Sequence, residues 1–394
     1  MRTIYRAFPV IDPATIFRQV REHNPILDAQ RFHLYASGRA ALYHAAMCLK
    51  YSGIQRVYAP EYHCGVEIEA LVRAGLIVHF YPLEDNLDCD ISWLQSHAIE
   101  KGGALLIIHY YGFPQPLDKI TTLCREKGMP LIEDCAHALY SSCKGRMLGT
   151  FGDLAIFSLQ KTIPLPNGGG LLINNPELCD PLPGAPCNDK VLWKIAARSM
   201  LDFQADKTGV MAVIARAILT LYANLVKDNV TAMPLRTTNT LEGNEEPDYY
   251  HVAHQDYGKG IFPFASKLLK PSFWQDIVQQ RRNNYVALEK ELSAFSVFSP
   301  LFETLPEGCC PLCFPVRVSD NDLWAAKLRE QGILPFVFGR FAHPLVKKSG
   351  QHGGGWQTNI IGLPLQQQLS TVDCCAIWRA TNKLASNSIV LSRG

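Results

Sequence analysis

Lys161 lies in the segment FSLQKTIPLPNGGG, between an apolar run and a glycine-rich turn, and is the first residue whose position suggests chemistry. An amine at the end of a buried strand is partly removed from water, which favours its neutral and nucleophilic form. For this segment alone, a lysine exposed in a hairpin loop is the alternative. Lys161 is therefore a candidate catalytic residue whose role depends on its neighbours.

The second candidate segment is IEDCAHAL, in which Asp134 ends an apolar run and is followed by His137. Open α/β sheets bind ligands at the carboxyl ends of their strands. A carboxylate there could keep a pyridine nitrogen protonated, and an imidazole could bond an oxygen on the same ring. On this motif alone, a loop-capping Asp134 and a core His137 are equally good readings.

The third segment, SGRAAL, begins where a short strand ends and a helix starts. The N–H groups of Ser37, Gly38 and Arg39 at such a helix start can bind an anion such as phosphate. Ser-Gly helix caps without a ligand are also common. Ser158 is close to Lys161 in the chain, and its hydroxyl could reach the same anion. A phosphate turn, a ring carboxylate and a lysine, in this order, indicate a site for pyridoxal phosphate (PLP).

With these segments the sequence resembles the DegT/StrS family of sugar aminotransferases, within the fold type I superfamily of PLP enzymes. SGRAAL is similar to the family's phosphate turn, and HYYGFPQPLD and IEDCAHAL are similar to the segments that follow it. LCFPVRV and NIIGLPLQQQLS resemble its C-terminal landmarks, so the resemblance runs through nearly the whole chain. It implies a large α/β domain with a mainly parallel mixed sheet flanked by helices, plus a smaller C-terminal α+β domain.

The resemblance also implies an activity. It is that of a PLP-dependent aminotransferase, which moves an amino group from a donor such as glutamate to a keto acceptor. The family's usual acceptors are nucleotide-linked keto sugars, used in polysaccharide or secondary-metabolite biosynthesis. In this comparison Lys161 forms the Schiff base with PLP and shuttles the proton, Asp134 pairs with the pyridine nitrogen, and His137 lies near the ring oxygen. A homodimer with shared active sites is implied as well.

The cofactor-binding residues follow the family pattern with some departures. Ser158, with the Gly38 and Arg39 amides, would hold the phosphate, although Ser158 is closer to the lysine than in commoner members. The family's Asn-x-Arg segment, which reaches the neighbouring subunit's phosphate, is Gly258-Lys259-Gly260 here. We expect Lys259 to replace the arginine as a point charge.

The residue that stacks on the cofactor ring falls in the segment Tyr62-His63-Cys64. Tyr62 and His63 are both candidates, and the sequence does not decide between them. Arg340 and His343, in FGRFAHPL, could contact a substrate carboxylate or phosphate, or lie in a solvated loop.

Alternation of short apolar runs with helical stretches between about residues 31 and 175 independently predicts an α/β domain with a mainly parallel sheet. Residues 181–257 depart from this rhythm and predict a helical insertion. We expect a large PLP-binding domain over residues 1–270 and a small domain over residues 271–394.

Composition limits the partners. The chain has 38 Lys and Arg against 36 Asp and Glu, so no basic field predicts nucleic-acid binding. The first residues lack the apolar run of a secretory signal, and we expect residence in the cytoplasm. Residues 209–226 are borderline for a membrane span but include Arg216, so we expect a buried or interfacial helix rather than a span. A membrane-surface or partner-docking role is the alternative for this helix.

The 13 cysteines are scattered among apolar positions and predict reduced, mostly buried thiols. Cys310 and Cys313 have a Cys-x-x-Cys spacing, but no second spaced pair accompanies them, so we expect no metal site. Two functional alternatives stay open. One is a PLP-dependent dehydratase or other non-transaminating enzyme, although family dehydratases carry histidine in place of the lysine. The other is a catalytically idle PLP-binding regulatory protein.

Overall fold

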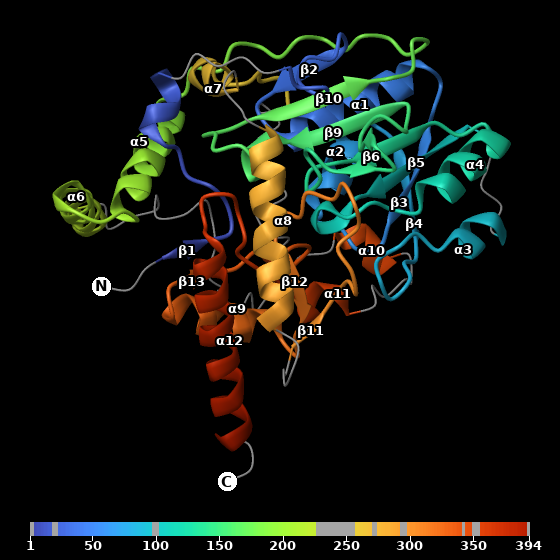
Figure 1. The fold of residues 1–394 in the computed structure, drawn as a ribbon. Helices are drawn as coiled ribbons and strands as arrows, with labels where there is room; N and C mark the ends of the chain where they lie inside the picture. Colours follow the sequence, from blue (N-terminus) through green and yellow to red (C-terminus); the bar gives the residue numbers. More distant parts are fainter. Residues whose placement is uncertain are drawn as a thin grey trace.

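A seven-stranded sheet with the order β2-β10-β9-β6-β5-β3-β4 forms the centre of the computed structural model (Figure 1). The structure describes residues 4–17, 23–96, 102–225, 257–269, 274–291, 298–340, 343–348 and 355–391. β10 is antiparallel to both of its neighbours, and the other neighbouring strands are parallel. The predicted mainly parallel mixed sheet is thus confirmed. Its strands are β2 Phe32–Tyr35, β3 Arg56–Pro60, β4 Ile77–Tyr81, β5 Gly103–Ile108, β6 Leu131–Asp134, β9 Leu154–Ser158 and β10 Gly169–Ile173.

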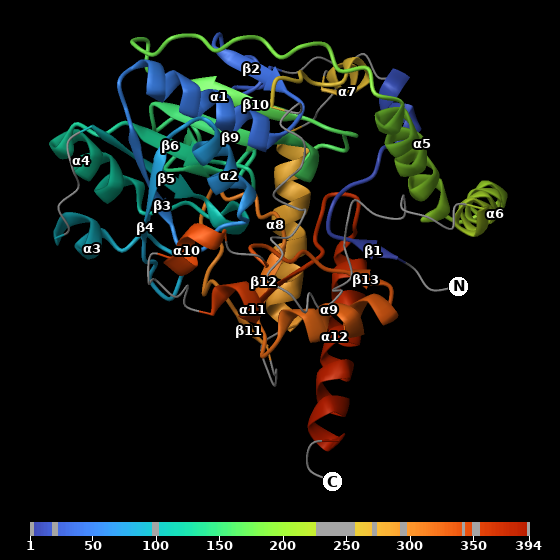
Figure 2. The same ribbon diagram turned by 180° about the vertical axis from the view of Figure 1, so that it is seen from behind.

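Helices cover both faces of this sheet, as the two opposite views show (Figures 1 and 2). The alternating side chains of β5 explain why every residue of this strand is buried. Ala104 and Leu106 pack in the same cluster as the helices α1 Gly38–Tyr51 and α2 Val66–Arg73. Leu105 and Ile107 pack in the cluster on the other face. The helices of that face are α3 Ile91–Ser96, α4 Leu117–Lys127 and α7 Pro263–Leu268.

A smaller α+β part follows, as predicted, and its core cluster also contains residues of the large part such as Tyr62, Ile108 and Tyr111. Its three-stranded sheet has the order β11-β12-β14, and its two long helices, α8 and α12, pack against each other. β1 Tyr5–Arg6 pairs with β13 Ile333–Leu334, so the N-terminal strand contacts this part of the molecule. The division of the chain at residue 270 stays a prediction. The elements are α8 Trp274–Glu291, β11 Ser299–Pro300, β12 Phe314–Arg317, α9 Asn321–Glu330, α10 Pro344–Lys348, α11 Trp356–Asn359, β14 Ile360–Leu363 and α12 Thr371–Leu391.

The insertion forms a helical hairpin that projects from one end of the large sheet (Figures 1 and 2). It consists of α5 Lys190–Ala205 and α6 Val210–Leu225, and residues 226–256 of the predicted insertion lie outside the described residues. Arg216 bonds the carbonyls of Ala205 and Lys207, which fixes the turn between the two helices. The opposite face of α6 exposes large apolar side chains, namely Val210, Met211, Val213, Ile214, Ile218 and Leu221.

In the described parts of the chain, no helix has both the length and the apolar character needed to cross a membrane. The remaining short elements of these parts are η1 Pro13–Phe17, η2 Tyr110–Gly112, β7 Ser142–Cys143, β8 Arg146–Met147 and η3 Leu159–Lys161.

Candidate active site

The three candidate segments meet at one edge of the large sheet. β10 lies between β2 and β9, and Gly169 is opposite Tyr35 of β2 and Ser158 of β9. On the other side of β9, Asp134 at the end of β6 is the register partner of Ile156. The turn after β2, the end of β6 and the lysine turn after β9 therefore lie side by side, as the order of segments predicts.

The turn after β2 has the geometry of an anion site. Ser37 is the N-cap of α1, and its hydroxyl oxygen accepts a hydrogen bond from the Ala40 N–H at 3.2 Å. The Gly38 and Arg39 amides belong to the first helical turn, where N–H groups have no partner within the helix. Ser158 lies beside this turn, because a Cβ placed on Gly38 would be 3.4 Å from the Ser158 Cβ. The structure thus brings together all four predicted phosphate-binding residues.

Two glycines join the lysine turn to the phosphate turn. A Cβ on Gly169 would lie 2.1 Å from the carbonyl carbon and oxygen of Ser37, so only glycine allows this close approach. The neighbouring Gly168 donates its N–H to the Ala36 carbonyl at 3.0 Å and accepts from the Leu159 N–H at 3.0 Å. A single backbone network therefore positions both turns.

Lys161 is the last residue of the single-turn helix η3, directly after β9, and its side chain is half-buried. Its Nζ lies 5.8 Å from the ring centre of Phe336. The same Phe336 ring meets the His137 ring at 5.3 Å, and the charge of Lys161 lowers the pKa of both Asp134 and His137 against or along with the effect of burial. The predicted catalytic residues therefore form one group.

Asp134 is buried, with 1% of its surface exposed. Its Oδ1 accepts the Ala136 N–H at 2.8 Å, which fixes the carboxylate at the end of β6. Burial raises the pKa of Asp134, and the hydrogen bond from Ala136 and the charge of Lys161 oppose this rise in part. A carboxylate held in this way is suited to pair with a cationic group of a ligand.

His137 has a defined tautomer. Its Nδ1 accepts the Tyr111 N–H at 3.3 Å, so in the neutral ring the proton is on Nε2. Burial holds the pKa of His137 well below its usual value, and the charge of Lys161 lowers it further, so the ring is neutral. Nε2 is buried and has no hydrogen-bond partner among the described residues. A buried donor of this kind needs an acceptor, and an oxygen of a bound cofactor would provide one.

Aromatic rings enclose His137 and were not identified from the sequence. The Tyr111 ring stacks on the imidazole with the centres 5.8 Å apart. Phe336 and Phe338 meet it edge-on at 5.3 and 4.6 Å. These two residues follow β13, and no local signal in the sequence brings them to the end of β6. Together the rings keep water from the imidazole.

Glu67 is a second residue that the sequence did not single out. It lies in the first turn of α2 but is 8% exposed, and its Oε2 accepts the Cys64 N–H at 3.0 Å. Burial raises the pKa of Glu67 to about 7, and the nearby charge of Asp134 adds to this rise, while Lys161 opposes it. The site therefore contains two buried carboxyl groups and one amine. The signal that could have identified Glu67 was an acid in the first turn of the helix that follows β3.

Tyr62 is fully buried between other aromatic rings. Its hydroxyl donates to the Phe338 carbonyl and lies 3.0 Å from the hydroxyl of Tyr111. Its ring stacks on Tyr110 at 5.4 Å. Tyr62 is thus one ring away from His137, and its stacking on a cofactor stays a prediction.

His63 occupies a different environment. Its Nδ1 lies 3.0 Å from the Pro60 carbonyl, and its Nε2 accepts the His343 N–H at 3.2 Å. The ring stacks on Phe80. The described contacts of His63 include none with Lys161, Asp134 or His137. The structure therefore does not support His63 as the residue that stacks on the cofactor.

Lys259 borders the phosphate turn through its backbone. Its carbonyl accepts the Ala36 N–H at 3.0 Å, and the residue forms a β-bridge with Ala185. Its expected contact with a neighbouring subunit's phosphate stays a prediction.

Arg340 pairs with Asp322 at 2.8 Å.

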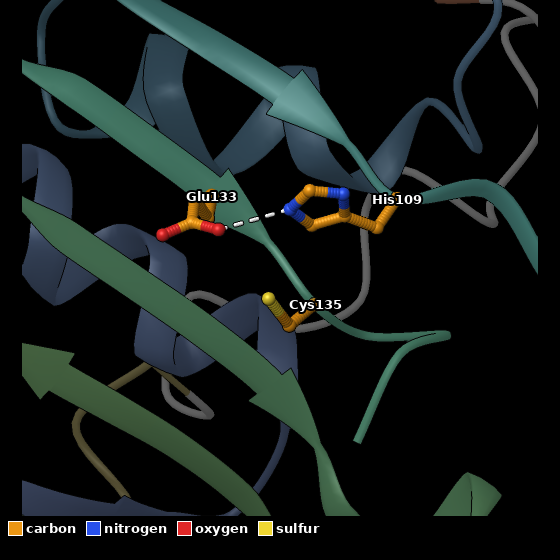
Figure 3. Close-up of side chains that lie close together, drawn as sticks. All are labelled: His109, Glu133 and Cys135. Atoms are coloured by element: carbon orange, nitrogen blue, oxygen red, sulfur yellow. Dashed lines mark hydrogen bonds and ion pairs between the residues drawn. The ribbon is translucent and has the colours of Figure 1, made fainter. Parts of the chain in front are cut away.

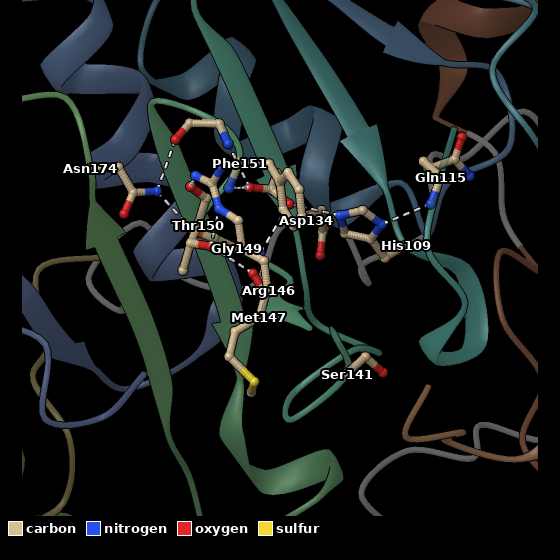
Figure 4. Close-up of polar contacts among 12 residues, drawn as sticks. His109, Gln115, Asp134, Ser141, Arg146, Met147, Gly149, Thr150, Phe151 and Asn174 are labelled. Atoms are coloured by element: carbon tan, nitrogen blue, oxygen red, sulfur yellow. Dashed lines mark hydrogen bonds and ion pairs between the residues drawn. The ribbon is translucent and has the colours of Figure 1, made fainter. Parts of the chain in front are cut away.

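His109, Glu133 and Cys135 lie close together at the ends of β5 and β6 (Figure 3). Their spacing would suit a metal ion, but the His109 Nε2 donates to Glu133 at 3.0 Å and its Nδ1 accepts the Gln115 N–H. The carboxylate of Glu133 also accepts the N–H groups of Gly149, Phe151 and Gly152. Figure 4 shows the loop with Gly149, Thr150 and Phe151, and His109 with Gln115. Burial raises the pKa of Glu133, but these hydrogen bonds outweigh burial and lower it. We interpret the cluster as a structural network that holds the loop.

The cysteines of the Cys-x-x-Cys segment are buried free thiols. Burial raises the pKa of Cys310 to about 11 and raises that of Cys313 further, so both remain protonated near neutral pH. Protonated thiols in a core pack as small apolar side chains.

Residues 35–182 match the sequence profile of the DegT/DnrJ/EryC1/StrS aminotransferase family, whose members use PLP. GDP-perosamine synthase of Escherichia coli O157:H7 is 30% identical over 148 residues, which are 37% of this chain and 41% of the relative. A UDP-N-acetyl-3-dehydro-alpha-D-glucosamine 3-aminotransferase of Acidithiobacillus ferrooxidans is 26% identical over 234 residues, 56% of this chain and 62% of the relative. The chain thus spans less than two thirds of the length of each of these relatives.

The fold extends the likeness to the whole chain. A putative sugar aminotransferase of Streptococcus pneumoniae, Spr1654 in its PMP form, superposes with a TM-score of 0.67 and 16% identity, covering 100% of both chains. DesI with its TDP-sugar product gives a TM-score of 0.65 and 16% identity, covering 100% of this chain and 95% of the other. This chain therefore has the same fold as these two proteins. Residues 35–182, the part of the chain that matches the DegT/DnrJ/EryC1/StrS aminotransferase family, contain the turn after β2, Asp134 and Lys161.

Proposed function

We propose that this protein is a PLP-dependent aminotransferase. It moves an amino group from an amino-acid donor such as glutamate to a nucleotide-linked keto sugar, in polysaccharide or secondary-metabolite biosynthesis. The names of the relatives support the reaction and the class of acceptor. The observation that carries the proposal is the buried Nε2 donor of His137, which has no partner among the described residues and whose ring meets the same Phe336 ring as Lys161.

The residues of the site fit PLP. The Gly38 and Arg39 amides with the Ser158 hydroxyl would hold the phosphate, because they form an anion site at a helix N-terminus. Asp134 would pair with the protonated pyridine nitrogen, and Lys161 would bind the cofactor covalently. When bound, PLP supplies an electron sink for the bonds at the donor's α-carbon.

The side chains supply the proton transfers and the environment. Once the donor amine has replaced it on the cofactor, the free Lys161 amine would take the proton from the α-carbon of the donor and return a proton during the transfer. The Nε2–H group of His137 would donate a hydrogen bond to an oxygen of the cofactor, and the ring keeps its proton and stays neutral because burial opposes a charged ring. Phe336 and Phe338 exclude water from this region.

The proposal includes a homodimer in the cytoplasm, with Lys259 reaching the phosphate of the neighbouring subunit. Family resemblance supports the dimer, and the position of Lys259 beside the phosphate turn is compatible with a role near that group. Light scattering on the purified protein measures the oligomeric state. A monomer that transaminates at full rate would contradict the shared site.

A half-reaction tests the proposed activity. The purified protein is loaded with PLP and mixed with glutamate in the absence of an acceptor. We expect close to one equivalent of α-ketoglutarate per subunit, followed by continuous turnover when a nucleotide-linked keto sugar is added. If PLP binds but no amino donor yields its keto acid, the protein is a non-transaminating PLP enzyme or an idle PLP-binding protein.

A further inference from the structure

A hydrogen-bonded chain links the C-terminal part of the molecule to the lysine turn. Gln367 lies between β14 and α12, and its Nε2 donates to the Thr162 carbonyl at 2.8 Å. Thr162 directly follows Lys161 and caps η3. The Oε1 of the same glutamine accepts from Arg281 Nε at 2.8 Å. We call the pair of Arg281 and Gln367 the clasp.

Arg281 is unusual because it is a fully buried cation, with 0% of its surface exposed. Its Nη1 donates to the Pro311 and Leu312 carbonyls at 3.1 and 3.0 Å, and no carboxylate bonds it among the described residues. Burial lowers the pKa of Arg281 as a result. The guanidinium of Arg281 is hydrogen-bonded only by neutral oxygens, and burying a cation in this way costs free energy. The surrounding oxygens must therefore hold the guanidinium in a closely defined geometry.

Arg281 of the clasp is also linked to His137, through Leu312 and Tyr111. The Leu312 N–H donates to the Tyr111 carbonyl at 2.8 Å, and the Tyr111 N–H donates to His137 Nδ1. Tyr111 has a φ of 57°, a left-handed conformation that is unfavourable for a tyrosine and must be held in place. One arm of the network therefore ends at the residue after Lys161, and the other ends at His137.

We propose that Gln367, held by Arg281, is a positioning residue for Lys161. η3 is one turn of three residues, too short to fix the direction of its last side chain by itself. The hydrogen bond to the Thr162 carbonyl supplies the missing restraint from the C-terminal part. The orientation of the amine then depends on the placement of that part against the large sheet. This inference rests on the proposed function for its catalytic meaning.

Gln367→Glu separates positioning from folding. A glutamate still accepts from Arg281, as a charged partner, but it cannot donate to the Thr162 carbonyl near neutral pH. We therefore expect this variant to keep the wild-type melting temperature or to exceed it. Gln367→Ala loses both hydrogen bonds and serves as the less selective variant. Gln368→Ala is the matched control, because Gln368 makes two similar bonds with the Val10 backbone.

Two measurements report on the position of the Lys161 amine. The first uses cofactor-free protein and measures the labelling rate of Lys161 by an amine-specific acylating reagent, with peptide mass spectrometry. We expect Gln367→Glu to raise this rate about 5-fold, the equivalent of one lost hydrogen bond, while the exposed Lys194 keeps its rate. The second measures PLP affinity and the pH midpoint of the bound cofactor's absorbance. We expect about 5-fold weaker binding and a shifted midpoint.

The outcomes separate this inference from the proposed function. Gln367→Glu with wild-type labelling, PLP affinity and pH midpoint would overturn the positioning role, and so would equal changes in Gln368→Ala. A wild-type protein that binds no PLP would refute the proposed function, while the labelling experiment would still decide whether the clasp positions the amine.

Discussion

At the scale of single residues, the site places two buried carboxyl groups, Asp134 and Glu67, near one amine. Two carboxylates close together in a buried site do not both ionise easily, so one of them tends to keep a proton. Glu67 is the group that keeps it below about pH 7, because burial and the charge of Asp134 raise its pKa to about 7. Asp134 is then free to act as the carboxylate.

The pH dependence of the free energy of unfolding should reveal the proton on Glu67. The unfolded chain releases the Glu67 proton near pH ~4.3, whereas the folded state holds it until about pH 7. Between these values the folded state binds more protons, so wild-type stability falls as the pH rises through the window. Glu67→Gln removes the titration. When the pH is raised from about 5 to about 8, we expect the free energy of unfolding of the variant to increase by roughly 1–3 kcal/mol relative to that of the wild type.

Urea unfolding of the cofactor-free protein at both pH values measures this change. Glu69→Gln on the same helix is the control with the opposite sign. Hydrogen bonds from Arg73 and His343 overcome the effect of burial and lower the pKa of Glu69, so this variant should lose stability near neutral pH. An identical pH dependence in Glu67→Gln and the wild type would refute the raised pKa.

Asp134→Asn tests the role of the other carboxyl. The amide keeps the size of the side chain, but it cannot stabilise a protonated pyridine nitrogen. We expect turnover to fall by at least about 100-fold while PLP remains bound. Rate measurements at saturating substrate, with the cofactor absorbance as the check on binding, decide the outcome. Undiminished turnover would show that the carboxylate has no such role.

At the scale of elements, the convergence of three turns depends on Gly169. Replacing it with alanine would press a methyl group against the Ser37 backbone, with no flexible side chain to move aside. We expect Gly169→Ala to cost more than about 3 kcal/mol of folding stability, or to prevent PLP binding. Gly258→Ala is the control, because its Cβ would meet nothing within 4 Å. Urea unfolding and PLP titration measure both effects, and a wild-type result for Gly169→Ala would contradict the close packing of the turns.

The strands and helices between residues 31 and 175 could be predicted from the sequence, because apolar periodicity is a local signal. The meeting of SGRAAL, Asp134 and Lys161 was also predictable, since strand ends in a parallel sheet share an edge. The enclosure of His137 by Phe336 and Phe338 could not be predicted in this way, because it depends on how a distant segment packs. The burial of the Glu67 side chain likewise depends on how the elements pack and not on the local sequence pattern.

At the scale of the whole molecule, the helical hairpin is the main departure from the sheet-centred architecture. Val213 on the outer face of α6 is 63% exposed, whereas its neighbour Ala212 is 1% exposed. We expect Val213→Lys to change the free energy of unfolding by less than about 0.5 kcal/mol, and Ala212→Lys to lower it by more than about 2 kcal/mol. Urea unfolding with light scattering measures both. If Val213→Lys destabilises the protein and dissociates a dimer, a second copy covers this face.

The overall arrangement brings the lysine turn beside the turn after β2 and the end of β6, which carries Asp134. The most direct test is to incubate the protein with PLP, reduce it with borohydride and map the modified peptide by mass spectrometry. We predict one phosphopyridoxyl group per chain, attached to Lys161, and its loss in Lys161→Ala. Attachment to another lysine, or an unchanged amount of adduct in Lys161→Ala, would contradict the account.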